Sequence, residues 1–191
     1  MTGRLDELLP EPLTGDQRAL RDELVHGRRA ERPPPFPLTD EHGRINGPAR
    51  AWLLQPALGA GLERLGAAIG YDLTLPARCR EIVVLTVAHH HDSPFELYAH
   101  RLGAARAGLT DAEIDELCAG RVPSGADPRE RCAHRVTRAL LSTGRLDDAA
   151  YREATGLLGP AGLFEVTTLT GFYTMVALQL SVYAIAPPAA G

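Results

Sequence analysis

The stretch REIVVLTVAHHHDSPFELYAHRLGAARAGLTDAEIDEL, residues 80–117, decides the fold. Its run IVVLTV has the β-branched composition that local propensity assigns to a strand. No partner strand or hairpin signal occurs elsewhere in the sequence, and a lone strand would leave its backbone groups unpaired. We therefore interpret this run as the fully buried middle of a helix.

Two helix starts follow in the same stretch. Ser93, Pro94 and Glu96 supply an N-cap residue, a proline at the first helical position and a glutamate at the third. Gly108 is a favourable C-terminal stop, and Thr110 opens a second capping box. The stretch therefore predicts three consecutive helices joined by short loops.

More helices are expected on both sides of this centre. Apolar residues at helical spacing predict a helix that begins at Pro56. Capping signals and spacing predict further helices over residues 16–26, 128–142 and 148–158, and a long apolar helix from about Ala161. The sequence thus predicts an all-α protein without internal repeats.

Residues 26–48 interrupt this helical pattern. They carry five prolines and three glycines, a composition that does not sustain regular structure. We interpret residues 1–47 as an N-terminal arm and an irregular proline-rich connector, and residues 48–191 as one helical domain.

The bulk composition excludes several classes of protein. Of the 191 residues, 45% are hydrophobic and 23% are charged, as in soluble globular proteins. The formal net charge is -4 and no Lys/Arg cluster occurs, so we expect no nucleic-acid partner. The three cysteines show no CxxC spacing, which favours a reducing cytoplasm over a disulfide framework or a zinc knuckle.

The C-terminal segment carries no charge from Val166 to Gly191, and it is long enough to span a bilayer. Against a membrane span stand its threonines, Gln179 and the lack of basic anchoring loops. The first thirty residues also lack an apolar signal core. We expect no membrane partner and a helix buried in a core or a subunit interface.

Polar chemistry is concentrated in HHHDSPFELYAH, residues 89–100. Successive helical residues turn through about 100°, so the three consecutive histidines cannot share one ion. Glu96 and His100, at i and i+4, lie on one helix face. The sequence places no third ligand, so we predict no metal, with His90 or His91 beside that pair as the alternative.

Two carboxyl groups have competing interpretations. Glu96 could be functional, or it could serve only as the capping-box partner of Ser93. Glu81 begins the most apolar run of the chain, where a desolvated carboxyl group would hold its proton near neutral pH. Its structural alternative is an ion pair with Arg78 or Arg80.

Residues 80–117 resemble the signature segment of the carboxymuconolactone decarboxylase family. In that family a buried helix beginning Arg-x-Glu precedes a second helix that ends A-x-x-x-G-L/V-(T/S)-x-x-E-I. GRINGPARAWLLQPALGAGLERLG (residues 43–66) and LTGFYTMVALQLSVY (residues 169–183) resemble the N-terminal part and the last helix of its longer members. The resemblance covers about residue 40 to the C-terminus. It implies an alkylhydroperoxidase D-like helical bundle that forms a homo-oligomer, either trimer-based, hexameric or dimeric.

The family divides at positions that matter for the chemistry. Its alkylhydroperoxidase D-type members carry a redox CxxC whose cysteines match Ser93 and Glu96. They also carry a histidine that matches His100 and an upstream glutamate that matches Glu81. This chain lacks both sulfurs, so thiol-dependent peroxide reduction is not expected. The decarboxylase branch carries Glu-Leu-x-x-His, which residues 96–100 match.

The resemblance implies a cofactor-free lyase or isomerase that acts on a small cyclic acid or lactone. We expect His100 to be the proton donor, with Glu96 orienting it or tuning its pKa. Glu81 would be a second carboxyl group in the pocket. A non-catalytic helical binding or assembly module and a metal-dependent enzyme are the alternatives.

Four further residues are candidates for substrate contacts. Arg80 or Arg101 could meet a substrate carboxylate, although Arg101 lies about 100° around the helix from its neighbour His100. Tyr98 and Tyr173 are candidate donors that line the pocket.

Overall fold

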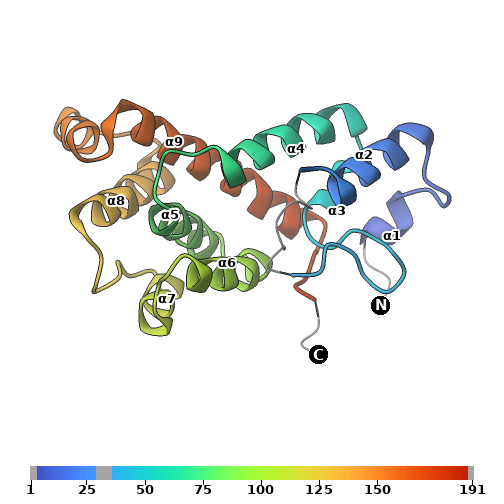
Figure 1. Cartoon of the computed structure of the whole chain (residues 1–191), viewed down its shortest axis with the longest axis horizontal. Helices are drawn as coiled ribbons and strands as arrows, with labels where there is room; N and C mark the ends of the chain where they lie inside the picture. The colour runs from blue at the N-terminus through green and yellow to red at the C-terminus, as the bar shows by residue number, and fades with distance from the viewer. Residues whose placement is uncertain (1–3, 29–35, 189–191) are drawn as a thin grey trace. The chain divides into compact units, whose positions relative to one another are not determined.

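The computed structural model describes residues 4–28 and 36–188 (Figure 1). Within these ranges the regular structure is helical, apart from one isolated β-bridge between Thr39 and Ile45. The all-α prediction is therefore confirmed. The chain forms two compact units, Met1–Asp72 together with Gln179–Gly191, and Leu73–Leu178. The predicted domain boundary at residue 48 stays a prediction.

The first unit contains α1 (Arg4–Leu8), α2 (Gly15–His26), α3 (Ala49–Trp52) and α4 (Pro56–Tyr71). Helices α2 and α3 both pack against α4. Gln17 of α2 donates a hydrogen bond of 3.0 Å to the carbonyl of Leu53, and the Trp52 indole donates one of 2.9 Å to the Gln179 side chain. The helices predicted over residues 16–26 and from Pro56 are thus confirmed.

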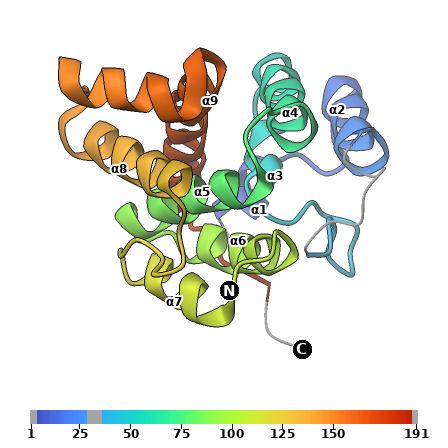
Figure 2. The same cartoon turned by 60° about the vertical axis from the view of Figure 1, so that its left-hand side comes forward.

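The second unit contains α5 (Ala77–His90), α6 (Pro94–Arg106), α7 (Asp111–Cys118), α8 (Pro128–Thr143) and most of α9 (Asp148–Val182). Helix α5 packs against α6, α7 and α8, and Figures 1 and 2 show it between them. Residues 82–88 are buried without interruption. The strand-like run is therefore part of a helix. Its composition resembles that of a strand because a helix buried on all faces also favours apolar β-branched residues.

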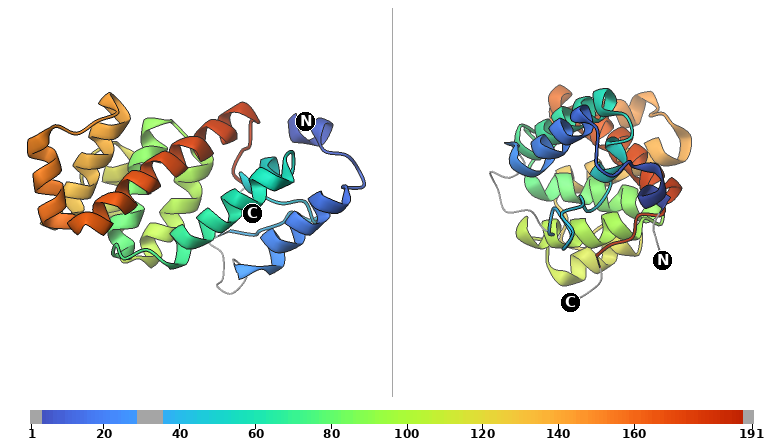
Figure 3. Two further views of the ribbon diagram at one scale, coloured as in Figure 1. Left: turned by 90° about the horizontal axis from the view of Figure 1, so that it is seen from above. Right: turned by 90° about the vertical axis from the view of Figure 1, so that its right-hand side faces the viewer.

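Helix α9 consists of two helical segments that meet at Gly159. This residue has φ 74° and ψ 166°, a left-handed conformation that glycine adopts without strain, and Pro160 follows it. Figure 3 shows the change of direction, which confirms the prediction of separate helices. Among the described residues, α9 is the helix long and apolar enough to cross a membrane, but half of the apolar window is buried inside the structure.

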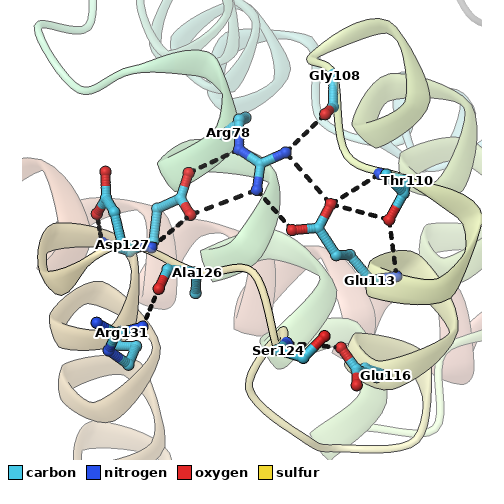
Figure 4. Close-up of polar contacts among 10 residues, drawn as sticks. Arg78, Gly108, Thr110, Glu113, Glu116, Ser124, Ala126, Asp127 and Arg131 are labelled. Carbon is cyan, nitrogen blue, oxygen red and sulfur yellow. Dashed lines mark hydrogen bonds and ion pairs between the residues drawn. The ribbon is translucent and has the colours of Figure 1, made fainter.

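Arg78 on α5 joins the first turns of α7 and α8 (Figure 4). Its guanidinium donates a hydrogen bond of 2.8 Å to Glu113 and one of 2.7 Å to Glu130. Both glutamates are also capping-box residues, with Thr110 and Asp127 as the N-caps. The hydrogen bond from Arg78 and those from Thr110 lower the pKa of Glu113 to about 2. This network fixes the two helix starts against the central helix.

Candidate active site

His100 of α6 meets Glu81 of α5. The distance between His100 Nδ1 and Glu81 Oε2 is 2.8 Å. The Glu81 side chain is 4% exposed and the His100 side chain is 21% exposed. A carboxylate only accepts hydrogen bonds, so Nδ1 carries the proton in this arrangement. The other ring nitrogen, Nε2, remains for a second partner.

Gly103 permits this close approach between α5 and α6. A Cβ atom at this position would lie 3.0 Å from Glu81 Oε2 and 3.2 Å from its carboxyl carbon, which is tighter than an ordinary contact. Gly103 lies three residues after His100, so both residues face the carboxylate. The absence of a side chain at Gly103 thus sets the position of Glu81 against the histidine.

Glu81 is ionised, and the prediction that it holds a proton near neutral pH is wrong. Burial raises its pKa, but the charge of His100 and the hydrogen bond to it act in the opposite direction. Arg80 donates a second hydrogen bond of 3.0 Å to the other carboxylate oxygen. The pKa of Glu81 is consequently lower than its ordinary value of 4.5. Of the two ion-pair alternatives, Arg80 is confirmed, whereas Arg78 binds Glu113 and Glu130.

Helix α9 contributes Tyr173 to the same place. The centroids of the Tyr173 and His100 rings are 4.9 Å apart and their planes are perpendicular, an edge-to-face contact. Tyr98, the other candidate donor, packs edge-to-face against Phe95 with 6.4 Å between the centroids. The structure therefore places Tyr173 directly against the histidine.

Glu96 is not the capping partner of Ser93. Ser93 makes no side-chain capping hydrogen bond, and its backbone N–H donates to the carbonyl of Ala88 at 2.9 Å. Glu96 is 2% exposed and Ser93 is 4% exposed, yet the Ser93 hydroxyl and both Glu96 oxygens lack a hydrogen-bond partner. The contact that orients His100 comes from Glu81, where the sequence favoured Glu96.

The Glu96 carboxyl group is poised between two protonation states. Burial raises its pKa to about 7. The charge of His100 and the nearby Ser93 hydroxyl act in the opposite direction, although the hydroxyl does not form a well-aligned hydrogen bond. Both the acid and the carboxylate are therefore populated near neutral pH. The site thus holds one ionised carboxylate, Glu81, and one carboxyl group that readily carries a proton.

Arg101 is directed toward α7 and away from the histidine. Its guanidinium donates a hydrogen bond of 2.6 Å to Asp115 and one of 3.1 Å to the Cys118 sulfur. Its side chain is 44% exposed. The structure does not bring this predicted substrate contact to the site, because the 100° turn after His100 carries it to the α7 side of the helix.

The three consecutive histidines diverge at the end of α5. His89 lies 3.0 Å from the carbonyl of Cys118, and His91 lies 3.4 Å from the Thr174 hydroxyl. The rings of His90 and His91 meet edge-to-face at 5.0 Å. In residues 4–28 and 36–188, no group of three His, Cys, Asp or Glu side chains is arranged to hold a metal ion. The alternative metal site is therefore not assembled from the residues proposed for it.

A groove of about 810 Å³ lies at another place in this unit, along α8 and the start of α9. Its lining includes Cys132, His134, Arg138 and the ion pair of Arg135 with Glu153. Burial, followed by the charges of Arg138 and Arg135, lowers the pKa of His134 to about 4. A histidine that is neutral at pH 7 is a poor proton donor, so the Glu81–His100 pair is the stronger acid/base candidate.

Two features of the site were missed at the sequence level. The contact between Glu81 and His100 joins residues 19 positions apart on different helices, and spacing within one helix does not reveal it. Ser93 was interpreted only as an N-cap. The available signal was its match to a cysteine position of the alkylhydroperoxidase D-type members, which marks it as a site position.

Comparison with known proteins gives a match to one family model and a fold. Residues 56–139 match the sequence model of the carboxymuconolactone decarboxylase family. The debrominase Bmp8, solved with 2,3,4-tribromopyrrole and with a cysteine replaced by alanine, aligns at a TM-score of 0.66 and 12% identity, over 76% of this chain and 78% of that one.

A second similar structure is ATU0492 from Agrobacterium tumefaciens, a protein of unknown function that its description links to the antioxidant defence protein AhpD. It aligns at a TM-score of 0.66 and 15% identity, over 77% of this chain and 99% of that one. A search of the curated proteins gives no match. At these identities the two structures establish the fold, and the predicted alkylhydroperoxidase D-like bundle is confirmed.

Proposed function

We propose that this chain, whose residues 56–139 match the model of the carboxymuconolactone decarboxylase family, is a cofactor-free acid/base enzyme that decarboxylates or isomerises a small cyclic acid or lactone. The observation that carries this proposal is the 2.8 Å hydrogen bond between the buried Glu81 carboxylate and His100. A histidine oriented by a carboxylate can give and take protons near neutral pH.

Each member of this cluster has a proposed role. Glu81 holds the tautomer of His100 in which Nδ1 is protonated, and its charge stabilises the imidazolium form. Nε2 is then the atom that delivers a proton to the substrate. Tyr173, edge-on to the imidazole, restricts rotation of the ring. Arg80 keeps Glu81 ionised, so Glu81 positions the histidine and does not itself donate the proton.

The reaction follows from these roles. When CO2 leaves a carbon conjugated to an unsaturated lactone, the electron pair of the broken bond spreads to the lactone carbonyl oxygen and forms a dienolate. The His100 imidazolium then donates its proton to the ring carbon, and neutral His100 recovers a proton from water. An isomerisation would use the same histidine, first to remove a proton and then to return it to a different carbon.

Of the two arginines considered for a substrate carboxylate, Arg80 is the one retained. It lies beside Glu81 with its side chain 27% exposed, whereas Arg101 is engaged by Asp115. Its position beside Glu81 and His100 makes Arg80 the arginine that we propose to meet a substrate carboxylate at this cluster.

Thiol chemistry is the alternative suggested by the debrominase and AhpD-related neighbours, and this chain favours it less. Ser93 and Glu96 occupy the positions at which the resemblance expects a redox CxxC. Cys79 and Cys132 are buried, and burial raises the pKa of Cys79 to about 12, so this thiol stays protonated. Cys118 lies near neither of them in the sequence and contacts Arg101.

The test is turnover of a panel of carboxylated lactones and β-keto acids by the wild type and by His100→Ala. CO2 release and deuterium uptake from D2O report on the two chemical steps. We expect His100→Ala to lose turnover while it keeps its helical content and melting temperature. Unchanged turnover in the variant would exclude the histidine as the proton donor. A lower melting temperature without any chemical defect would favour the non-catalytic binding module.

We also propose that the protein is a cytoplasmic homo-oligomer. The cytoplasmic location rests on the cysteine pattern of the sequence. The observation that supports association is the exposure of two large apolar side chains of α9, Phe164 at 70% and Leu178 at 54%. Exposed apolar side chains on one long helix favour association with another subunit.

A further inference from the structure

Two polar side chains beside the catalytic histidine are buried without any hydrogen-bond partner. They are Ser93, at the N-cap of α6, and Glu96, in its first turn. An unpaired buried polar group destabilises the folded state, so native proteins rarely contain one without a reason. Ser93 and Glu96 are three residues apart and Glu96 and His100 are four apart, so the three side chains follow one face of α6.

The helix itself does not use these groups. The capping contacts of Ser93 and Glu96 are absent, whereas the capping box of Thr110 with Glu113 is fully formed on α7. Pro94 occupies the first helical position and has no N–H group, so the start of α6 has one donor fewer to satisfy. A structural role as a cap therefore does not explain the Ser93 and Glu96 side chains.

We propose that the Ser93 hydroxyl and the protonated Glu96 carboxyl form an oxyanion hole, in which both O–H groups donate to the carbonyl oxygen of a lactone substrate. This inference rests on the proposed function and names the part of the substrate that the site recognises. The ligand class is an unsaturated lactone whose carbonyl oxygen takes up negative charge during the reaction. Preorganised donors at such an oxygen act strongly where water is excluded.

The charges around Glu96 fit this role. Glu81 and Arg80 of α5 neutralise each other, and His100 of α6 supplies the proton for carbon. An ionised Glu96 would repel the developing oxyanion, whereas the acid form donates to it. Burial, which raises the pKa of Glu96 to about 7, keeps that acid form available near neutral pH. A carboxylic acid kept neutral by its surroundings is a known type of oxyanion donor.

The reaction balances with these groups alone. The bond between the ring carbon and CO2 breaks, and its electron pair moves to the carbonyl oxygen, where Ser93 and Glu96 stabilise it. The electron pair then returns to the ring carbon, which takes a proton from His100. Water afterwards supplies a new proton to His100. No oxidant or reductant takes part, CO2 is the leaving group, and neither O–H group loses its proton.

Paired variants test the oxyanion hole. Ser93→Ala removes the hydroxyl and Ser93→Thr keeps it, while Glu96→Ala removes the donor and Glu96→Gln offers an amide N–H. We expect each alanine variant to lower kcat about 100-fold with little change in KM, and each conservative variant to recover part of the loss. Ser93→Ala should melt at the wild-type temperature or higher, because no hydrogen bond of the folded protein is lost.

Binding of tetronate, the stable enolate of a hydroxylated unsaturated lactone, tests the same donors without turnover. Calorimetry at pH 6 and pH 8, in buffers of different ionisation heat, gives affinity and proton uptake. We expect tighter binding at pH 6, proton uptake at pH 8 that Glu96→Gln abolishes, and about 10-fold weaker binding by Ser93→Ala.

The outcomes separate this inference from the proposed function. Unchanged kcat in Ser93→Ala and Glu96→Ala, beside lost turnover in His100→Ala, would overturn the oxyanion hole and leave the acid/base enzyme standing. A wild type that does not bind tetronate would also overturn it. Tetronate binding that depends on both residues, without lactone turnover by the wild type, would support the oxyanion hole and count against decarboxylation.

Discussion

The protonation of Glu96 makes a prediction about stability that runs against the usual effect of mutating a buried residue. The carboxyl group is 2% exposed, and burial raises its pKa from 4.5 to about 7. In the unfolded chain the same group ionises near 4.5. A raised pKa in the folded state contributes stability that is complete below pH 4.5 and is lost as the pH rises through 7.

The size of the effect follows from the interval between the two pKa values. At about 1.4 kcal/mol for each pH unit, the interval from 4.5 to about 7 corresponds to about 3 kcal/mol. Glu96→Gln replaces the carboxyl group with a neutral group of the same shape, so this loss is absent from the variant. We expect the variant to be about 3 kcal/mol more stable than the wild type at pH 8 and about equal to it at pH 4.5.

The assay is urea denaturation of the wild type and Glu96→Gln at half-unit steps between pH 4.5 and pH 8. Because all other titrating groups are shared, their contributions cancel in the difference between the two free energies of unfolding. The difference should grow mainly between pH 5 and pH 7. A difference that stays constant across this range would refute the raised pKa, and with it the availability of the acid form near neutral pH.

Three further predictions concern other parts of the chain. Arg78→Ala leaves the buried carboxylates of Glu113 and Glu130 without their shared cation. We therefore expect the free energy of unfolding at pH 7 to fall by about 2–3 kcal/mol, and a fall of less than about 0.5 kcal/mol would contradict this. Gly103→Ala brings a methyl group to 3.0 Å from Glu81 and should lower kcat about 10-fold or more without unfolding the protein; Gly156→Ala, with nothing within 4 Å, is the matched control and should keep wild-type activity. Phe164→Glu should shift the sedimentation profile toward smaller species if α9 forms a subunit interface, and an unchanged profile would place that interface elsewhere.

Local signals in the sequence predicted the helices well. The capping box at Thr110 and the proline at the start of α4 both act within a few residues. The buried run 82–87 required a global argument, because its β-branched side chains fit a strand as well as a buried helix. The absence of partner strands in the sequence correctly predicted that this run is helical.

The site was less predictable, because it depends on which helix faces touch. Sequence spacing joined Glu96 to His100 on one helix, but the packing of α5 on α6 at Gly103 brings Glu81 to the histidine. The same packing gives the two carboxyl groups opposite pKa changes. Glu81 gains charged partners and its pKa is lowered, whereas Glu96 is buried without a well-formed hydrogen bond and its pKa is raised to about 7. Burial alone does not predict the protonation state of either carboxyl group, because the charged partners decide whether the pKa is raised or lowered.

Deuterium incorporation reports whether the Glu81–His100 pair delivers a proton to a substrate carbon. A carboxylated unsaturated lactone is turned over in D2O by the wild type and by His100→Gln, and the product is examined by mass spectrometry. We expect one deuteron on the ring carbon with the wild type and no enzymatic product with the variant. Deuterated product formed by the variant at the wild-type rate would contradict this expectation.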